Sequence, residues 1–172
     1  MAIKYLAAIP ESDFAEFARV VPKLLTPHAA YAEQVGRREA EWLRTPGNTV
    51  ELVLVTADDL KAYVARGRAL NLSALSVLAF EKGEAQSHME PYGGTYPESE
   101  GTIVRVTIRE GWVRPVSALW IAATPDPQAA VAAVRDRAQA DWTIEAFGPS
   151  PAGFVARYGL QPGQACPFPP PR

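Results

Sequence analysis

Residues 49–56 read TVELVLVT, an almost unbroken run of β-branched residues and leucine. A run of this kind is typical of a strand that is covered on both faces, because a strand with one face in water alternates apolar and polar residues. We therefore expect residues 49–56 to form a central strand of the sheet. The elements on either side of this strand then indicate the fold class.

Two helices are predicted between a first strand and this central strand. Residues 2–9 (AIKYLAAI) are expected to form the first strand, which ends at Pro10. Ser12 is suited to cap the helix that follows, and Pro27 takes the first position of a second helix, where no backbone N–H is needed. Apolar residues recur at helical spacing in both segments, which gives each helix one apolar face.

A third helix and a further strand are predicted after the central strand. Thr56 and Asp59 form a variant of the capping box at the start of this helix. Residues 72–80 (LSALSVLAF) are then predicted to form a strand. Strands that are joined through helices imply parallel or mixed pairing with right-handed connections.

The second half of the chain has a pattern typical of antiparallel strands. Residues 102–124 are expected to form two strands joined by a tight turn at Glu110–Gly111. A helix that begins at Pro127 leads to a sixth strand over residues 142–147. The proline-rich end of the chain is expected to be polyproline-like.

This order of elements predicts one α/β or α+β domain over residues 1–160. We expect a single-layer mixed sheet of about five or six strands, packed by about four or five helices. The alternative is a doubled ferredoxin-like arrangement, with two sheets side by side. Residues 161–172 are expected to form a Pro-rich C-terminal tail.

Composition argues against several classes of function. The formal net charge is -2, so the chain has no global attraction to phosphate backbones or anionic membranes. Cys166 is the single cysteine, which rules out an intramolecular disulfide, and no apolar run approaches the length of a spanning helix. We expect a cytoplasmic protein that binds neither nucleic acid nor membranes.

The connection that contains residues 86–101 is the first candidate site. It spans about 19 residues between predicted strands, and connections beyond about 12–15 residues are usually functional or disordered. His88 and Glu90 are the candidate catalytic residues, since imidazole titrates near neutral pH and a nearby carboxylate stabilises its charged form. Tyr92 and Tyr96 are candidate ligand contacts in the same loop. The plain alternative is a mobile or packed hairpin extension.

The predicted hairpin is the second candidate site. Arg105, Thr107 and Arg109 share one strand face, and Trp112 and Arg114 follow across the turn. Arginine and tryptophan are enriched where proteins recognise one another, so this face is expected to bind a protein partner or a small anion. A solvated sheet surface has the same composition, and that interpretation stays open.

Common catalytic motifs are missing from the sequence. It holds no Walker phosphate loop, no GxGxxG after a strand, no GxSxG elbow and no HExxH. Two histidines and one cysteine are too few and too scattered for a structural zinc site. No cofactor or metal is therefore expected.

Two functions of different kinds are consistent with these observations. The first is a non-catalytic cytoplasmic domain that acts through a protein partner or by self-association, for example as a homodimer. The second is a small enzyme or metabolite-binding protein whose pocket is closed by the loop at residues 86–101. The sequence slightly favours the first, and it does not decide whether the protein is an enzyme.

Overall fold

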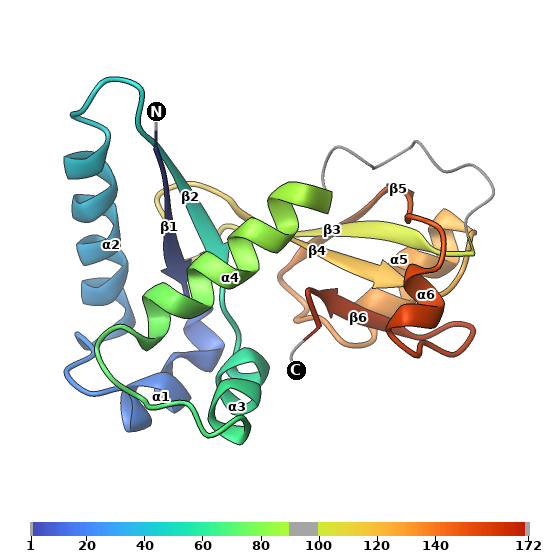
Figure 1. Cartoon of the computed structure of the whole chain (residues 1–172), viewed down its shortest axis with the longest axis horizontal. Helices are drawn as coiled ribbons and strands as arrows, with labels where there is room; N and C mark the ends of the chain where they lie inside the picture. The colour runs from blue at the N-terminus through green and yellow to red at the C-terminus, as the bar shows by residue number, and fades with distance from the viewer. Residues whose placement is uncertain (1, 90–99, 171–172) are drawn as a thin grey trace. The chain divides into compact units, whose positions relative to one another are not determined.

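The computed structural model describes residues 2–89 and 100–170 (Figure 1). The strands in these residues are β1 (Ile3–Ala8), β2 (Thr49–Leu54), β3 (Thr102–Ile108), β4 (Val116–Ala122), β5 (Thr143–Pro149) and β6 (Ala165–Phe168). The helices are α1 (Glu11–Val20), α2 (His28–Trp42), α3 (Ala57–Ala65), α4 (Ala74–Met89), α5 (Pro127–Arg135) and α6 (Phe154–Arg157).

The described strands form two sheets. One sheet contains β1 and β2 in parallel, with Ile3 opposite Thr49 and Ala8 opposite Leu54. The other sheet has the order β5-β3-β4-β6, and β3 with β5 and β4 with β6 are antiparallel pairs. The mixed α/β class is confirmed, whereas the predicted single mixed sheet is wrong.

The ferredoxin-like alternative also fails for the first sheet. This alternative correctly expects two sheets. A ferredoxin-like unit, however, follows a β-α-β-β-α-β order with four strands. β1 and β2 instead form a sheet of two strands. The fold therefore combines a small parallel sheet and a larger antiparallel one.

The chain divides into two compact units. Within the described chain, unit 1 comprises residues 2–83 and 109–116, and unit 2 comprises residues 84–89, 100–108 and 117–170. The units are interleaved in sequence, because α4 contributes its first part to unit 1 and its last part to unit 2. The expectation of one domain over residues 1–160 stays a prediction.

The β2 strand lies in the stretch TVELVLVT, as predicted. Leu52, Val53 and Leu54 are buried in succession. Because consecutive residues of a strand point to opposite faces, this succession means that both faces are covered. The expected central position is not confirmed, since β1 is its one strand partner in the described chain.

The segment 72–80, predicted as a strand, belongs to α4. Its buried side chains Ala74 and Leu78 are four residues apart, and buried Lys82 follows after four more. This spacing places them on one helical face. A short apolar run cannot be assigned to helix or strand by periodicity alone, and here the run continues into a helix of 16 residues.

Gly83 in α4 allows a close approach to β1. A Cβ atom built at this position would lie 2.2 Å from a ring carbon of Tyr5. The Tyr5 ring therefore occupies the space that a larger residue would need, which explains a glycine inside a helix. This contact packs α4 against β1 within unit 1.

The core of unit 2 lies on the antiparallel sheet. Ile103, Leu119, Ile121 and Phe168 form a buried cluster, against which side chains of α6 and β5 pack. The expected turn at Glu110–Gly111 is present, since the Trp112 N–H donates to the Arg109 carbonyl at 3.2 Å, but the connection is longer than a tight hairpin because β3 ends at Ile108 and β4 begins at Val116. The longer connection between them belongs to unit 1.

The expected polyproline-like tail contains a strand of this sheet. Residues 165–168 form β6, which pairs with β4 so that Phe168 lies opposite Leu119 and Ala165 opposite Ala122. Both Ala165 and Phe168 are buried. β6 is at the end of the sheet, and an edge strand tolerates Pro167 because its missing N–H is not needed on the open side.

Candidate functional site

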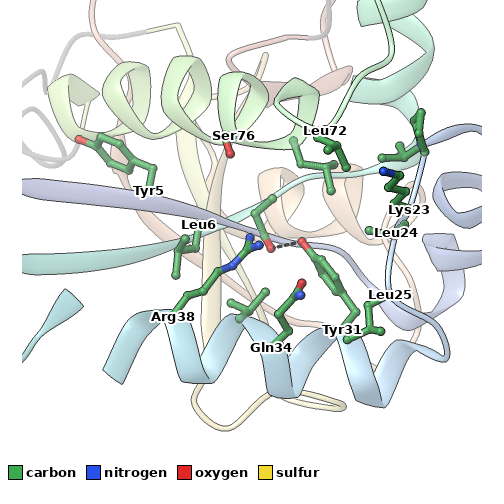
Figure 2. A pocket seen from close by; sticks show the side chains of 15 residues that line it. Tyr5, Leu6, Lys23, Leu24, Leu25, Tyr31, Gln34, Arg38, Leu72 and Ser76 are labelled. Carbon is green, nitrogen blue, oxygen red and sulfur yellow. Dashed lines mark hydrogen bonds between the residues drawn. The ribbon is translucent and has the colours of Figure 1, made fainter. Parts of the chain in front are cut away.

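One face of α2 is the framework of the candidate site in unit 1. Tyr31, Gln34, Val35 and Arg38 are spaced three, four and seven residues apart, so they lie on the same side of the helix. Tyr31 and Val35 are buried, while Gln34 is half-buried and Arg38 is exposed. Figure 2 shows Gln34 and Arg38 extending from α2 toward β1.

The same face of α2 covers the outer edge of β1. The N–H groups of Thr49 and Val55 donate to the carbonyls of Ala2 and Ala8, so the even-numbered carbonyls of β1 point to β2. The odd-numbered carbonyls point away from β2. Tyr31 Oη donates to the Ala7 carbonyl at 2.7 Å.

His28 completes this protection of the β1 edge. Its Nε2 lies 2.8 Å from the Ile9 carbonyl, as a ring N–H donor to that oxygen. The ring is buried and packs edge-on against Phe14 and Trp112. Covering an exposed strand edge prevents it from pairing with another chain. His28 therefore has a structural role.

A pocket of about 110 Å³ lies beside this edge (Figure 2). Its walls come from β1, α2, the connection between α1 and α2, and the first part of α4 with the residues before it. The polar lining residues other than tyrosine are Lys23, Gln34, Arg38 and Ser76. The remaining lining residues are aliphatic or aromatic: Tyr5, Leu6, Ala7, Val21, Pro22, Leu24, Leu25, Tyr31, Val35, Leu72 and Leu75.

The charges around this pocket have one sign. Lys23 and Arg38 are cationic, and the lining includes no Asp or Glu. No ion pair joins either cation to a described residue: the ion pairs found in residues 2–89 and 100–170 involve other side chains. Two uncompensated cations beside polar groups that can donate hydrogen bonds favour an anion.

Tyr31 contributes to the pocket as a neutral group. Burial raises the pKa of its phenol well above the ordinary value, and the charge of Arg38 lowers it by a smaller amount. Because the hydroxyl proton is donated to the Ala7 carbonyl, Tyr31 is not available as a general base near neutral pH. It adds no negative charge that would oppose an anion.

Lys23 has an unusual backbone conformation. Its φ is 57°, and among the described residues every other residue with a positive φ is a glycine. A side chain in the left-handed region costs roughly 1–2 kcal/mol. Such outliers are often found at ligand sites, and this one places a lysine on the pocket wall.

The loop residues proposed from the sequence lie mostly outside the described residues. Glu90, Tyr92 and Tyr96 fall within residues 90–99, which the structure does not describe. His88 is exposed in the last turn of α4. Residues 86–89 of the predicted connection belong to α4. The candidate catalytic role of His88 and Glu90 stays a prediction.

The candidate residues of the predicted hairpin are divided between the two units, and their role in binding a partner or an anion stays a prediction. Arg105 belongs to unit 2, where its guanidinium lies 4.2 Å from the ring centroid of Phe147. Arg109 is exposed in unit 1. Trp112 is buried against the rings of His28 and Tyr31, because the connection that carries it packs on α2.

Arg114 is engaged within unit 1. Its guanidinium donates to the Glu39 carboxylate at 2.8 Å and to the Val50 carbonyl at 3.1 Å. The side chain thus joins α2 to β2. This pairing leaves Arg114 less available to a partner than the sequence suggested.

A buried ion pair in unit 1 has a structural explanation. Lys82 Nζ lies 2.6 Å from Asp59 Oδ2. The same carboxylate accepts from the Thr56 N–H, and the Thr56 side chain accepts from the Asp59 N–H, so the predicted capping box is confirmed. We assign this group to the packing of α3 on α4.

Unit 2 has a hollow of a different kind. It measures about 600 Å³ and is lined by Ala123, Pro125, Val155, Ala156, Leu160, Pro162 and Glu100. Glu100 is its single charged lining residue. The hollow has no convergent polar groups of the sort that fix a small ligand.

Sequence reasoning did not identify Lys23, Gln34 or Arg38 as site residues. The spacing of Gln34 and Arg38 relative to Tyr31 was the available signal, since it placed both on the face that carries the apolar residues of α2. Lys23 gave no signal, because its approach to α2 depends on the path of the connection before α2.

Comparison with known proteins gave no match to a family model, a curated protein or a solved structure. Within residues 2–89 and 100–170, no helix is long and apolar enough to cross a membrane. The same residues contain no group of three or more His, Cys, Asp or Glu side chains that could hold a metal ion.

Proposed function

We propose that this protein binds a small organic anion in the pocket of unit 1. The observation that carries the proposal is that Lys23 and Arg38 both line this pocket, whose lining has no carboxylate. An arginine and a lysine that form no ion pair within residues 2–89 and 100–170 provide a site for a carboxylate or phosphate group. This pocket differs from the one expected under the loop at residues 86–101.

The proposal concerns binding and does not require catalysis. The lining contains no histidine, cysteine or carboxylate that could transfer a proton or attack a substrate near neutral pH. Tyr31 keeps its proton because burial raises its pKa. We therefore favour a metabolite-binding protein over an enzyme that uses this pocket, and its cytoplasmic location stays part of the proposal.

A titration with a panel of anions tests the proposal. Acetate, butyrate, citrate and inorganic phosphate would be added at constant ionic strength, with amide NMR shifts as the readout. At least one anion is expected to shift the amides of residues 21–25 and 31–38 in a saturable way. Absence of a saturable shift with all four anions would reject the proposed function.

Adjacent arginines on α2 supply a matched pair of variants. Arg38→Gln removes a lining cation and is expected to weaken binding about tenfold or more, as for loss of a charged hydrogen bond. Arg37→Gln removes an exposed arginine that pairs with Glu33 and does not line the pocket. The control variant should retain the affinity of the original chain.

Interaction with a protein partner or a second copy is a second proposal. Every large hydrophobic side chain that is exposed in the described chain belongs to unit 1: Ile3, Val20, Leu25, Leu43, Val64, Leu72, Phe80 and Val113. Val113 is 83% exposed beside buried Trp112. Such side chains favour association when they lie close enough to be covered together.

Sedimentation analysis tests self-association directly. If the chain forms a homodimer that covers Val113, Val113→Ser is expected to shift the population toward the monomer. A strictly monomeric chain at high concentration would contradict self-association and leave only a different protein as partner.

A further inference from the structure

We infer that the ligand of the unit 1 pocket is a short-chain monocarboxylate, with one carboxylate group and an aliphatic body of a few carbon atoms. This inference rests on the proposed function and specifies the chemical class of the ligand.

The donors suit a carboxylate. Arg38 offers a planar fork that can bind both oxygens of a carboxylate, and Lys23 adds a single positive charge. Gln34 and Ser76 add neutral side chains with hydrogen-bond donors to the lining. Two cations are more than sufficient to balance one carboxylate.

The backbone around the pocket is unsuited to a phosphate. Phosphate sites commonly use glycine-rich loops whose successive N–H groups surround the oxygens. The connection that lines this pocket reads VPKLL over residues 21–25, with no glycine and with a proline that lacks an N–H. A phosphate would therefore depend on side chains alone.

The apolar lining requires a ligand with an aliphatic part. Leu24, Leu25 and Leu72 lie on the same side of the pocket as Lys23 in Figure 2. Leu25 is 37% exposed and Leu72 is 65% exposed, so apolar surface remains accessible beside the charges. Covering that surface would favour an aliphatic chain over a fully polar anion.

The volume limits the length of that chain. The pocket measures about 110 Å³, somewhat less than the roughly 150 Å³ of an engineered cavity that binds benzene, a molecule of six carbon atoms. A ligand of about six non-hydrogen atoms, the size of butyrate, should fill it. Longer chains would extend past Leu72 into solvent.

A homologous series of probes tests this inference. Acetate, propionate, butyrate and hexanoate would be titrated at a constant ionic strength, together with butyramide and inorganic phosphate. Affinity is expected to rise about fourfold per methylene from acetate to butyrate and then to level off. Butyramide has the same body without the charge and should not bind detectably.

The outcomes separate this inference from the proposed function. Phosphate binding as tightly as butyrate, or equal affinity for acetate and butyrate, would overturn the monocarboxylate class while the anion pocket stands. Equal binding of butyramide and butyrate would overturn the role of the carboxylate. If no anion binds at all, the proposed function itself fails.

A surface variant tests the aliphatic contact without risk to folding. Leu72→Ser alters a side chain that is 65% exposed, so little destabilisation is expected. The variant should lose more affinity for butyrate than for acetate, which lowers the ratio of the two affinities about fourfold. Leu43→Ser, at a residue that is 48% exposed and outside the lining, should leave this ratio unchanged. An unchanged ratio in Leu72→Ser would overturn the assigned contact.

Discussion

Unit 1 and unit 2 differ in how their sheets are completed. In unit 2, four antiparallel strands form the sheet, and a cluster that includes Ile103, Ile121 and Phe168 is buried on it. In unit 1, two parallel strands form the sheet, and side chains from α2 satisfy carbonyls at the outer edge of β1. A two-stranded sheet is marginal by itself, so helices must supply what further strands would otherwise provide.

This difference explains why the candidate site lies in unit 1. The helix face that covers β1 carries polar and cationic side chains beside apolar ones, and the pocket forms where they converge. The hollow in unit 2 is almost wholly apolar and has Glu100 as its charged residue. A helix that covers a strand edge can therefore also carry other side chains that face a ligand.

The largest predicted effect is the loss of the buried ion pair of unit 1. Asp59→Ala is expected to lower the free energy of unfolding by about 3–5 kcal/mol, because it leaves the Lys82 charge buried without its partner. Urea denaturation would measure the loss. Asp58→Ala, at an exposed neighbour 3.9 Å from Lys61, should change stability by less than about 0.5 kcal/mol.

Hydrogen exchange in the same variant would sharpen the comparison between the units. If the units unfold independently, Asp59→Ala should lower protection in β1 and β2 and spare β3 and β4. Ile121→Ala in the core of unit 2 should do the reverse. Equal losses in both units would instead support the single domain over residues 1–160 that the sequence predicts.

A smaller effect is predicted at the edge of β1. Tyr31→Phe removes the hydrogen bond to the Ala7 carbonyl and should destabilise the chain by about 1–2 kcal/mol at pH 7. Urea denaturation again provides the measurement. A loss below about 0.3 kcal/mol would indicate that the edge carbonyl is satisfied in another way, and would weaken the contrast between the two sheets.

The raised pKa of Tyr31 predicts how the difference in stability between the original chain and Tyr31→Phe depends on pH. The unfolded phenol releases its proton near pH 10, while the folded phenol holds it to a higher pH because it is buried. Stability from this group is therefore complete below about pH 10 and falls as the pH rises further. Between pH 10 and 11 the original chain should approach Tyr31→Phe in stability by roughly 1 kcal/mol.

The smallest predicted effect on stability concerns Lys23. Lys23→Gly relieves the left-handed backbone but increases the freedom of the unfolded chain, so the free energy of unfolding should change by no more than about 1 kcal/mol. Anion affinity should nevertheless fall, because a lining cation is lost. A variant that keeps full affinity would show that Lys23 does not contact the ligand.

The exposed Lys61 supplies the control for this variant. Its Nζ lies 3.6 Å from the Glu16 carboxylate and 3.9 Å from the Asp58 carboxylate, and the residue does not line the pocket. Lys61→Gly lowers the net charge by the same amount, although its place inside α3 should make it more destabilising by about 1 kcal/mol. Its anion affinity should match that of the original chain.

Local patterns in the sequence were sufficient for much of the first unit. The run of β-branched residues predicted β2, and the spacing of Thr56 and Asp59 predicted the capping box of α3. These features depend on neighbours within a few residues, which the sequence contains. The stretch 72–80 failed because its apolar residues fit both periods, and only packing of Ala74 and Leu78 in unit 1 decides for a helix.

By itself the sequence determined the α/β class, the buried β2 strand, and the absence of the common catalytic motifs. Tertiary structure alone decided that the strands separate into two sheets, that Trp112 packs on His28, and that Lys23 and Arg38 line one pocket. The physical reason is range. Strand and helix patterns arise from neighbouring residues, whereas a pocket forms where segments distant in sequence meet.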